Sequence, residues 1–519
     1  MPIPNSQDRS FLKYITKFYG GMVRDDKSAV VGSAFNMEEI DVFSNVNFFQ
    51  AEQILTSDSI PASTEAYAYS AGDDDTTYAY GKETSGGKVR LLSVASGGAD
   101  NPGSFATLFT SAETTELATV VSGFKFFRST EASNNRYLLY VRGHGTTWYL
   151  VKYNLDTSTE TSVGQLTGLT GSFMRPTIKI IFGDAFITHG QYVAKFADDT
   201  SFTEKAFTLP KEWEGVDIEA VGDAAIILCR NRSRLTNETR GYWWNLTNTA
   251  TFEDVFSIPM GGPCWIKNIK EGVFMMTAAN GYAKFFKLSA AAKGAVPLEL
   301  PGLVLTNVAA DADTQPVSSP KMLSFKDKFL YFGVNKTDKT GIYVFGQMDA
   351  DKSYAVLLSK RFNQTDYSKH VPYAVHIQGP NYYAAYADNG TAEIMRCESN
   401  NSPGRSSNAV YESIWLDADE PFKDKTLQFV AVATYPLPAS TSVAVSVGTD
   451  YSSSYTALKR ASGTAHTTTS SVLAKLKAAI GANKKVFRIK VALTSSGTST
   501  PKVVALAFGG TVKPGIADS

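Results

Sequence analysis

The stretch TIKIIFGDAFITH (Thr177–His189) places the dipeptide Gly183–Asp184 between two short apolar runs. The stretch DIEAVGDAAIILC (Asp217–Cys229) repeats this layout around Gly222–Asp223. Short runs rich in β-branched and aromatic residues favour strands, and a Gly-Asp pair between two such runs is typical of a tight hairpin. Both stretches therefore predict antiparallel β-hairpins.

The same strand-turn-strand layout returns along the middle of the chain. Predicted turns near Gly183, Gly222, Glu271, Asp327 and Gly379 recur roughly every 40 to 55 residues, the spacing of a four-stranded propeller blade. Two weaker units precede them, at 65–95 and 123–155. We therefore expect an all-β protein with a β-propeller of about six to eight blades over residues 51–400. A set of stacked β-sandwiches is the alternative.

The character of the sequence changes after a polar run rich in Ser, Asn, Pro and Gly at 398–408. Alternating strands are predicted beyond it, at 428–434, 442–447, 486–493 and 502–508. Residues 401–519 are therefore predicted to form an antiparallel β-sandwich domain.

Helical periodicity is limited to two places, Ser10–Tyr19 and Ser471–Ile480. In the first, apolar residues fall on one helical stripe, Ser10 can cap the helix, and two glycines follow. We expect residues 1–50 to form an N-terminal arm, a short helix and a lead-in strand. A strand in place of the first helix is the alternative.

Composition excludes several classes of function. The 519 residues carry 50 basic and 50 acidic side chains, a balance that gives no bulk attraction for nucleic acid. No apolar run approaches the ~18 residues of a membrane span, and the first residues do not resemble a secretion signal. The three cysteines are far apart and are predicted to be reduced and buried. We expect synthesis in a cytoplasm and no membrane span.

No pattern of catalytic or metal-binding residues stands out. The chain lacks the Gly-x-Ser-x-Gly turn of hydrolases, and its five histidines are scattered. The acidic groups Asp73–Asp75 and Asp311–Asp313 lack the spacing of a calcium loop, so they are predicted to be solvated turns. We therefore predict no catalytic residue, no metal and no cofactor.

Several segments resemble the tail proteins of bacteriophages. They are FYGGMVRDD at 18–26, GSAFNMEEIDV at 32–42, RGYWWNLTNTATFED at 240–254, GGPCWI at 261–266 and IWLDADEPFKDK at 414–425. Within that group the chain is most similar to the tail nozzle, or tail tube hub, of short-tailed phages. The likeness covers separate pieces of the chain, and none of its motifs is as specific as a metal signature.

This resemblance implies a virion structural protein without an active site. It implies a homo-oligomeric ring, usually a hexamer, that lies below the portal and the head-tail adaptor. DNA would pass through the lumen without specific binding, and tail fibres or a tail plug would attach outside or at the tip. Assembly would take place in the host cytoplasm. Another tail or baseplate component, such as a minor tail or receptor-binding protein, and a polysaccharide-binding or polysaccharide-degrading propeller are the alternatives.

The N-terminal stripe is the candidate surface for the adaptor. A short terminal helix has little core of its own, so a partner groove could bury its apolar residues. Packing back on the propeller is the alternative. We expect deletion of residues 1–19 to leave a folded protein that fails to join head-tail complexes. The candidate contact residues are Phe11, Leu12, Ile15 and Phe18.

Overall fold

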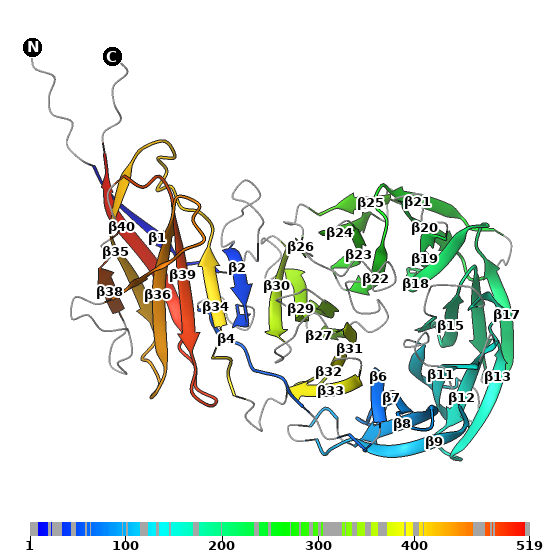
Figure 1. The fold of residues 1–519 in the computed structure, drawn as a ribbon. Helices are drawn as coiled ribbons and strands as arrows, with labels where there is room; N and C mark the ends of the chain where they lie inside the picture. The colour runs from blue at the N-terminus through cyan, green and yellow to red at the C-terminus, as the bar shows by residue number, and fades with distance from the viewer. Residues whose placement is uncertain are drawn as a thin grey trace, which may run out of the picture.

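The computed structural model is built almost entirely of β-strands (Figure 1). It describes residues 9–513 with gaps, the longer ones being 23–33, 115–122, 170–175, 305–323, 348–353, 362–370, 398–403 and 460–472. Within these described residues, the only helical segment is the 3-10 turn Thr167–Leu169. The prediction of an all-β chain is therefore confirmed.

The middle of the chain forms consecutive four-stranded antiparallel sheets, each built from strands that follow one another in sequence. The first two sheets contain β6 (Thr64–Ala71), β7 (Thr77–Glu83), β8 (Lys88–Val94), β9 (Ala106–Thr114), β10 (Phe124–Arg128), β11 (Arg136–His144), β12 (Thr147–Asn154) and β13 (Thr159–Gln165). The next two contain β14 (Thr177–Ile181), β15 (Asp184–His189), β16 (Tyr192–Ala197), β17 (Ser201–Thr208), β18 (Trp213–Val221), β19 (Ala224–Asn231), β20 (Thr239–Trp244) and β21 (Asp254–Ile258).

Three further sheets complete the series. One contains β22 (Pro263–Ile269), β23 (Gly272–Ala279), β24 (Tyr282–Ser289) and β25 (Gly294–Pro297), with β26 (Leu303–Val304) beside β24. Another run contains β27 (Ser324–Lys326), β28 (Phe329–Val334), β29 (Gly341–Gln347) and β30 (Tyr354–Arg361). The last contains β31 (Val371–Gln378), β32 (Asn381–Asp388) and β33 (Thr391–Cys397), and its fourth strand is the early β5 (Thr56–Ser57).

These sheets are arranged around a common centre (Figure 1). First strands of neighbouring sheets contact one another, as β10 contacts β14 and β14 contacts β18, while outer strands such as β13, β17, β21 and β25 lie at the rim. The last sheet closes the ring, because β31 and β33 contact β6 of the first one. This radial arrangement is a β-propeller.

Glycines allow the predicted hairpin turns to adopt a backbone conformation that residues with side chains rarely adopt. Gly183 has a φ of +88° and Gly222 a φ of +63°, values that side chains rarely tolerate. Gly183 lies between β14 and β15, and Gly222 lies between β18 and β19. The hairpins predicted at these two places are confirmed.

Strands from both ends of the chain lie together beside the propeller in a unit that we call the terminal module. One of its sheets has the order β1-β40-β35-β38, and the other has the order β2-β34-β39-β36-β37. Their strands are β1 (Arg9–Ile15), β2 (Ala34–Glu38), β34 (Ala409–Ser413), β35 (Lys425–Thr434), β36 (Ser442–Thr449), β37 (Thr456–Leu458), β38 (Leu473–Lys477), β39 (Phe487–Thr494) and β40 (Val503–Val512).

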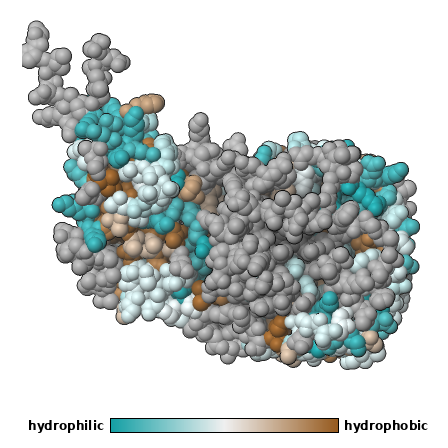
Figure 2. All heavy atoms as spheres, in the orientation of Figure 1, coloured by the Kyte–Doolittle hydropathy of each residue, from teal (hydrophilic) through white to brown (hydrophobic). Residues whose placement is uncertain are grey.

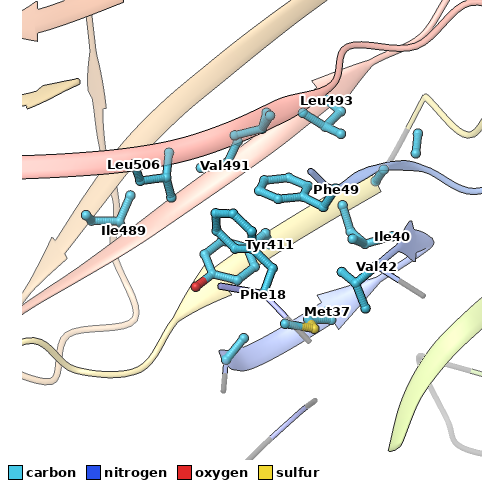
Figure 3. Packing of buried hydrophobic residues seen from close by; sticks show 14 of the residues in the cluster. Phe18, Met37, Ile40, Val42, Phe49, Tyr411, Ile489, Val491, Leu493 and Leu506 are labelled. Atoms are coloured by element: carbon cyan, nitrogen blue, oxygen red, sulfur yellow. The ribbon is translucent and has the colours of Figure 1, made fainter. Parts of the chain in front are cut away.

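A single hydrophobic core joins the two sheets of the terminal module (Figure 3). Phe18 packs edge-on against Phe49 and Tyr411, with ring centroids 4.7 and 5.3 Å apart. Val491 and Leu506 come from the C-terminal strands of the same core. Residues from the two ends of the sequence are therefore needed together to bury this core.

The terminal module is continuous with one propeller sheet through β2. This strand pairs with β34 on one side and with β30 on the other, where Glu38 lies opposite Leu358. Glu38 also forms an ion pair with Arg361. Nearby, the Lys360 ammonium lies 2.9 Å from Oε1 of Glu52, and Lys360 is almost completely buried. The junction is thus both hydrogen-bonded and ionic.

Both predicted helices are wrong where the structure describes them. Residues 9–15 form strand β1, and Leu473–Lys477 within the second predicted helix forms strand β38. In β38 exposed and buried residues alternate strictly, and β1 pairs with β40 over seven residues. The apolar residues of each stretch fit a period of two as well as a period of 3.6, and backbone pairing with a neighbouring strand decides between them.

Candidate partner-binding surface

The four predicted contact residues divide between the core and the surface. Phe11 and Ile15 are half-buried against the terminal core, and Phe18 is only 3% exposed within it. Leu12 remains 49% exposed. The structure therefore brings Phe11, Ile15 and Phe18 together inside the module and leaves Leu12 on the other side of β1.

Strand geometry explains this division. Successive side chains of a strand point to opposite faces, so Phe11 and Ile15 share the face that packs on Phe508 and its neighbours. The Phe11 and Phe508 rings lie 6.1 Å apart. Leu12 and Tyr14 share the opposite face, where Tyr14 is 65% exposed. β1 is therefore part of the module's sheet, and the predicted docking of a free arm has no counterpart in residues 9–15.

The outward side of this sheet is largely apolar on β1, β40 and β35, whereas β38 places Lys475 and Lys477 on that side together with Leu473. Strand register places Leu12 opposite Gly509, which in turn lies opposite Phe429. Tyr14 lies opposite Ala507, which lies opposite Ala431. We call this surface the terminal sheet face and define it by residues Leu12, Tyr14, Phe429, Ala431 and Leu473. Figure 2 shows hydrophobic residues on the visible side of the same module.

Lysines border the terminal sheet face. Leu473, 62% exposed, lies at one end of β38, and the Lys475 ammonium lies 4.2 Å above the centre of the Phe429 ring. On the other side of the edge strand β1, which Lys13 shares with Phe11 and Ile15, Lys13 forms an ion pair with Asp419. Charged side chains near a strand edge discourage uncontrolled strand pairing, so this surface is suited to specific contacts through its side chains.

Tyr14, Phe429 and Leu473 are surface residues that the sequence patterns did not reveal. Tyr14 would have been found by reading 9–15 with a period of two, since that period places it beside Leu12. Phe429 and Leu473 joined no predicted site because their neighbours on β1 are more than 400 positions away in sequence, and no local pattern reveals that pairing.

The two histidines with described side chains occupy packed positions. Nε2 of His189 lies 2.9 Å from the carbonyl oxygen of Glu204, and burial lowers the pKa of His189 to about 4. His376 packs against both Tyr69 and Tyr383, which also contact each other, and burial lowers the pKa of His376 to about 4 as well. Both imidazoles are therefore neutral at pH 7.

Acidic and sulfur groups singled out in the sequence also have structural surroundings. Asp73 pairs with Arg128, and Asp74 pairs with Arg136. Cys229 and Cys264 are buried and free, as predicted. The acidic group at 311–313 and the side chains of the remaining cysteine and histidines lie outside the described residues.

One group of charges lies on the inner strands of the propeller. The Lys179 ammonium is 3.0 Å from Oε2 of Glu219 and 3.6 Å from Oδ1 of Asp217. Lys267 approaches Glu219 at 3.3 Å, and Lys125 lies on the neighbouring inner strand β10. We call Lys125, Lys179, Asp217, Glu219 and Lys267 the axial charge cluster.

The two carboxylates of this cluster are already engaged. Asp217 accepts hydrogen bonds from the backbone amides of Ile218 and Ile266 at 2.9 and 3.2 Å, so it ties β18 to β22. Burial raises the pKa of the Asp217 carboxyl. Burial also opposes ionisation of Glu219, but Lys179 and Lys267 outweigh it and lower the pKa of Glu219. Glu219 is therefore the stable anion of the cluster.

Within the described part of the chain, no three potential metal-ligating side chains lie close enough to hold an ion. In the same part of the chain, no helix is both long and apolar enough to cross a membrane.

Comparison with known proteins identifies no family. No protein-family model matches the sequence, and no curated protein matches it. Among solved structures, the β-propeller domain of the Trilobed protease from Pyrococcus furiosus is 9% identical with a TM-score of 0.37, covering 64% of this chain and 96% of that one. An α-L-arabinofuranosidase from Fusarium graminearum is 9% identical with a TM-score of 0.34, covering 68% and 98%.

A third similar structure is the exo-β-1,3-galactanase from Phanerochaete chrysosporium, 8% identical with a TM-score of 0.29, covering 96% of this chain and 100% of that one. Such low TM-scores carry no argument about fold or function. The propeller is identified from the strand pairing of this chain. The surfaces of this chain are the evidence that bears on its function.

Proposed function

We propose that this chain is a structural protein of a phage virion tail, the nozzle or hub of a short-tailed phage, and not an enzyme. Copies of it form a ring, a hexamer, below the portal and head-tail adaptor. DNA leaves through the lumen without specific binding, and fibres or a plug attach to the ring. The chain assembles in the host cytoplasm. The resemblance of the segments at 18–42, 240–266 and 414–425 to phage tail proteins is the starting point for this proposal.

The proposal extends to the finer architecture. The propeller has seven blades, and β5 completes the last of them, so that an early strand and a late sheet close the ring together. The terminal module is a β-sandwich whose sheets enclose the core around Phe49 and Tyr411. Placing both chain ends in the sandwich leaves the propeller as a continuous insertion between them.

The terminal sheet face is the observation that carries an assembly role. Leu12, Tyr14 and Leu473 are each about half exposed or more. The intervening strands carry uncharged residues on this side, namely Gly509 and Phe429 in the row of Leu12 and Ala507 and Ala431 in the row of Tyr14. A contiguous apolar patch on a sheet face costs solvation free energy unless a partner covers it. The resemblance places the adaptor next to the ring, and we assign the adaptor as the occupant of this face.

A double substitution, Leu12→Asp with Tyr14→Asp, tests this assignment. Two carboxylates on the terminal sheet face would be desolvated by any partner covering it, so adaptor binding should fall at least about tenfold. Co-sedimentation of the purified chain with the adaptor measures the loss. The matched control is Tyr451→Asp, because Tyr451 is an exposed aromatic residue elsewhere on the module.

Normal incorporation of the double variant into head-tail complexes would contradict the assignment. Loss of ring formation with adaptor binding retained would also contradict it, because the face would then lie between copies of the chain. Loss of adaptor binding with an intact ring supports it.

The axial carboxylates do not favour a polysaccharide-degrading propeller. Glycoside hydrolysis needs one carboxyl group as acid and another as nucleophile or base. Asp217 is fully buried and accepts hydrogen bonds from two backbone amides. Glu219 forms ion pairs with two lysines. We therefore do not propose Asp217 and Glu219 as the catalytic pair of a glycosidase.

A further inference from the structure

The axial charge cluster contains more positive than negative groups. Lys125, Lys179 and Lys267 face two carboxylates among the described residues of β10, β14, β18 and β22. If Asp217 is ionised the excess is one positive charge, and if burial keeps it protonated the excess is two. The sign of the excess is thus independent of the state of Asp217.

The ion pairs distribute this excess unevenly. Lys179 and Lys267 share Glu219, whose carboxylate lies 3.0 and 3.3 Å from their ammonium groups. No ion pair to Lys125 is found among the described residues, and its side chain reaches solvent. Lys125 is therefore the cation that an incoming ligand can approach.

The surroundings of Lys125 disfavour its charge in the absence of a ligand. Surrounding protein atoms, together with Lys267 and Lys179, lower the pKa of Lys125 to about 8, although Glu219 acts in the opposite direction. An anion next to Lys125 would offset the repulsion among the three ammonium groups.

We propose that the centre of the propeller binds a small oxyanion of the phosphate class, with Lys125 as the principal contact and Lys179 and Lys267 as supporting charges. The two supporting lysines are held in place, because Asp217 ties β18 to β22 and Glu219 joins Lys179 of β14 to Lys267 of β22. Such a fixed group of charges loses little conformational freedom when the anion binds.

His376 lies near Lys125 and adds no positive charge to the cluster. Its ring packs against the buried Tyr69 and Tyr383, with the His376 ring centroid 6.0 Å from each tyrosine ring. His376 is neutral at pH 7 because burial lowers its pKa to about 4, so only the lysines attract the anion. Because the attraction comes from this one local group of ammonium charges, we expect a compact anion as the ligand.

Isothermal titration of the full-length chain with inorganic phosphate at fixed ionic strength tests the proposal. Lys125→Met should weaken phosphate binding about tenfold or more, because one of three nearby cations is removed. The same variant should melt at an equal or higher temperature without phosphate, since it relieves repulsion among the lysines. This second result separates loss of binding from loss of fold.

Lys211→Met is the matched control, because Lys211 is an exposed lysine in the turn before β18. It should bind phosphate like the unchanged chain. Equal phosphate affinity in the Lys125→Met variant, or equal loss in the Lys211→Met variant, would overturn the proposal. A short DNA oligonucleotide that binds through Lys125 where phosphate does not would overturn it too, because the site would then recognise a nucleic-acid backbone.

Discussion

The propeller pairs strands that are close in sequence, whereas the terminal module pairs strands that are far apart in sequence. In the propeller each four-stranded sheet joins consecutive strands, as β14 to β17 do between Thr177 and Thr208. In the terminal module β1, which begins at Arg9, pairs with β40, which ends at Val512. Short loops cost less closure entropy than long ones. Local turns therefore determine the strand pairing of the propeller sheets, while the strand pairing of the terminal module depends on packing between distant segments.

The largest effect should follow from removing the N-terminal part of the shared core. Phe18→Ala should destabilise the terminal module by about 3–5 kcal/mol, because a fully packed phenylalanine is lost and a cavity remains. Deletion of residues 1–19 should cost more, since it also removes β1 from the edge of β40. The free arm predicted from the sequence would have left the deleted chain folded, whereas the structure leads us to expect a destabilised terminal module. Denaturant unfolding followed by hydrogen exchange in β35 and β40 measures both changes.

Tyr14→Ala is the control for this comparison. Tyr14 is exposed on the other side of β1, so its loss should change the free energy of unfolding by no more than about 0.5 kcal/mol. Full stability of the Phe18→Ala variant would show that the N-terminal segment is dispensable for the core.

Breaking the ionic junction should have the next largest effect. Burial opposes ionisation of Glu52, and Lys360 is the cation that nevertheless lowers the pKa of its carboxyl group. Lys360→Met would leave the Glu52 carboxylate without this cation, so the free energy of unfolding should fall by about 3–4 kcal/mol. Hydrogen exchange should rise in both β2 and β30. The double variant Glu52→Gln with Lys360→Met removes the unpaired charge and should recover part of the loss, whereas no recovery would count against a charge effect.

Lowering the pH should have a smaller effect, which acts on the propeller through the buried His189. The native pKa of His189 is about 4, below the ordinary 6.5, because the ring is buried. Between these values the unfolded chain binds the proton and the native propeller does not, so stability present above pH 6.5 is lost as the pH falls toward 4. For the fully buried His189 the loss should reach up to about 3 kcal/mol.

A His189→Gln variant should show a smaller loss over that pH interval. The lowered pKa of Glu204 beside it contributes in a separate range, below its ordinary value of 4.5. Hydrogen exchange of β15 and β16 between pH 7 and pH 4.5 provides the measurement. An unchanged pH profile in the variant would exclude His189 as the cause.

The smallest effect on stability is expected at the terminal sheet face. Leu12→Asp and Tyr14→Asp are exposed changes, so each should alter the free energy of unfolding by about 0.5 kcal/mol or less. Thermal unfolding of the isolated chain checks this. A large destabilisation would mean that the face is packed in the chain itself, and the binding defect expected of the double variant could then not be attributed to a partner.

The sequence was sufficient to predict the propeller because its information is local. Gly183 and Gly222 sit at turns that need a positive φ, and apolar runs flank each turn. The role of β5 could not be predicted, because Thr56–Ser57 pairs with Met395–Arg396 far along the chain. The strand at 9–15 was predicted as a helix because one short apolar stripe fits both periods.

The candidate surface was only partly predictable for the same reason. Leu12 was identified from its apolar character, but its neighbours on the terminal sheet face come from β35 and β38. The axial charge cluster was not predicted at all. Lys125, Lys179 and Lys267 are unremarkable in sequence, and only the radial arrangement of β10, β14 and β22 groups them.

Electron microscopy of the purified full-length chain tests the central claim most directly. The proposed nozzle predicts sixfold rings with a lumen wide enough for duplex DNA and with a neutral or mildly acidic lining. A chain that stays monomeric at the concentrations of virion assembly, or a ring whose lumen is strongly basic or too narrow for a duplex, would contradict the account.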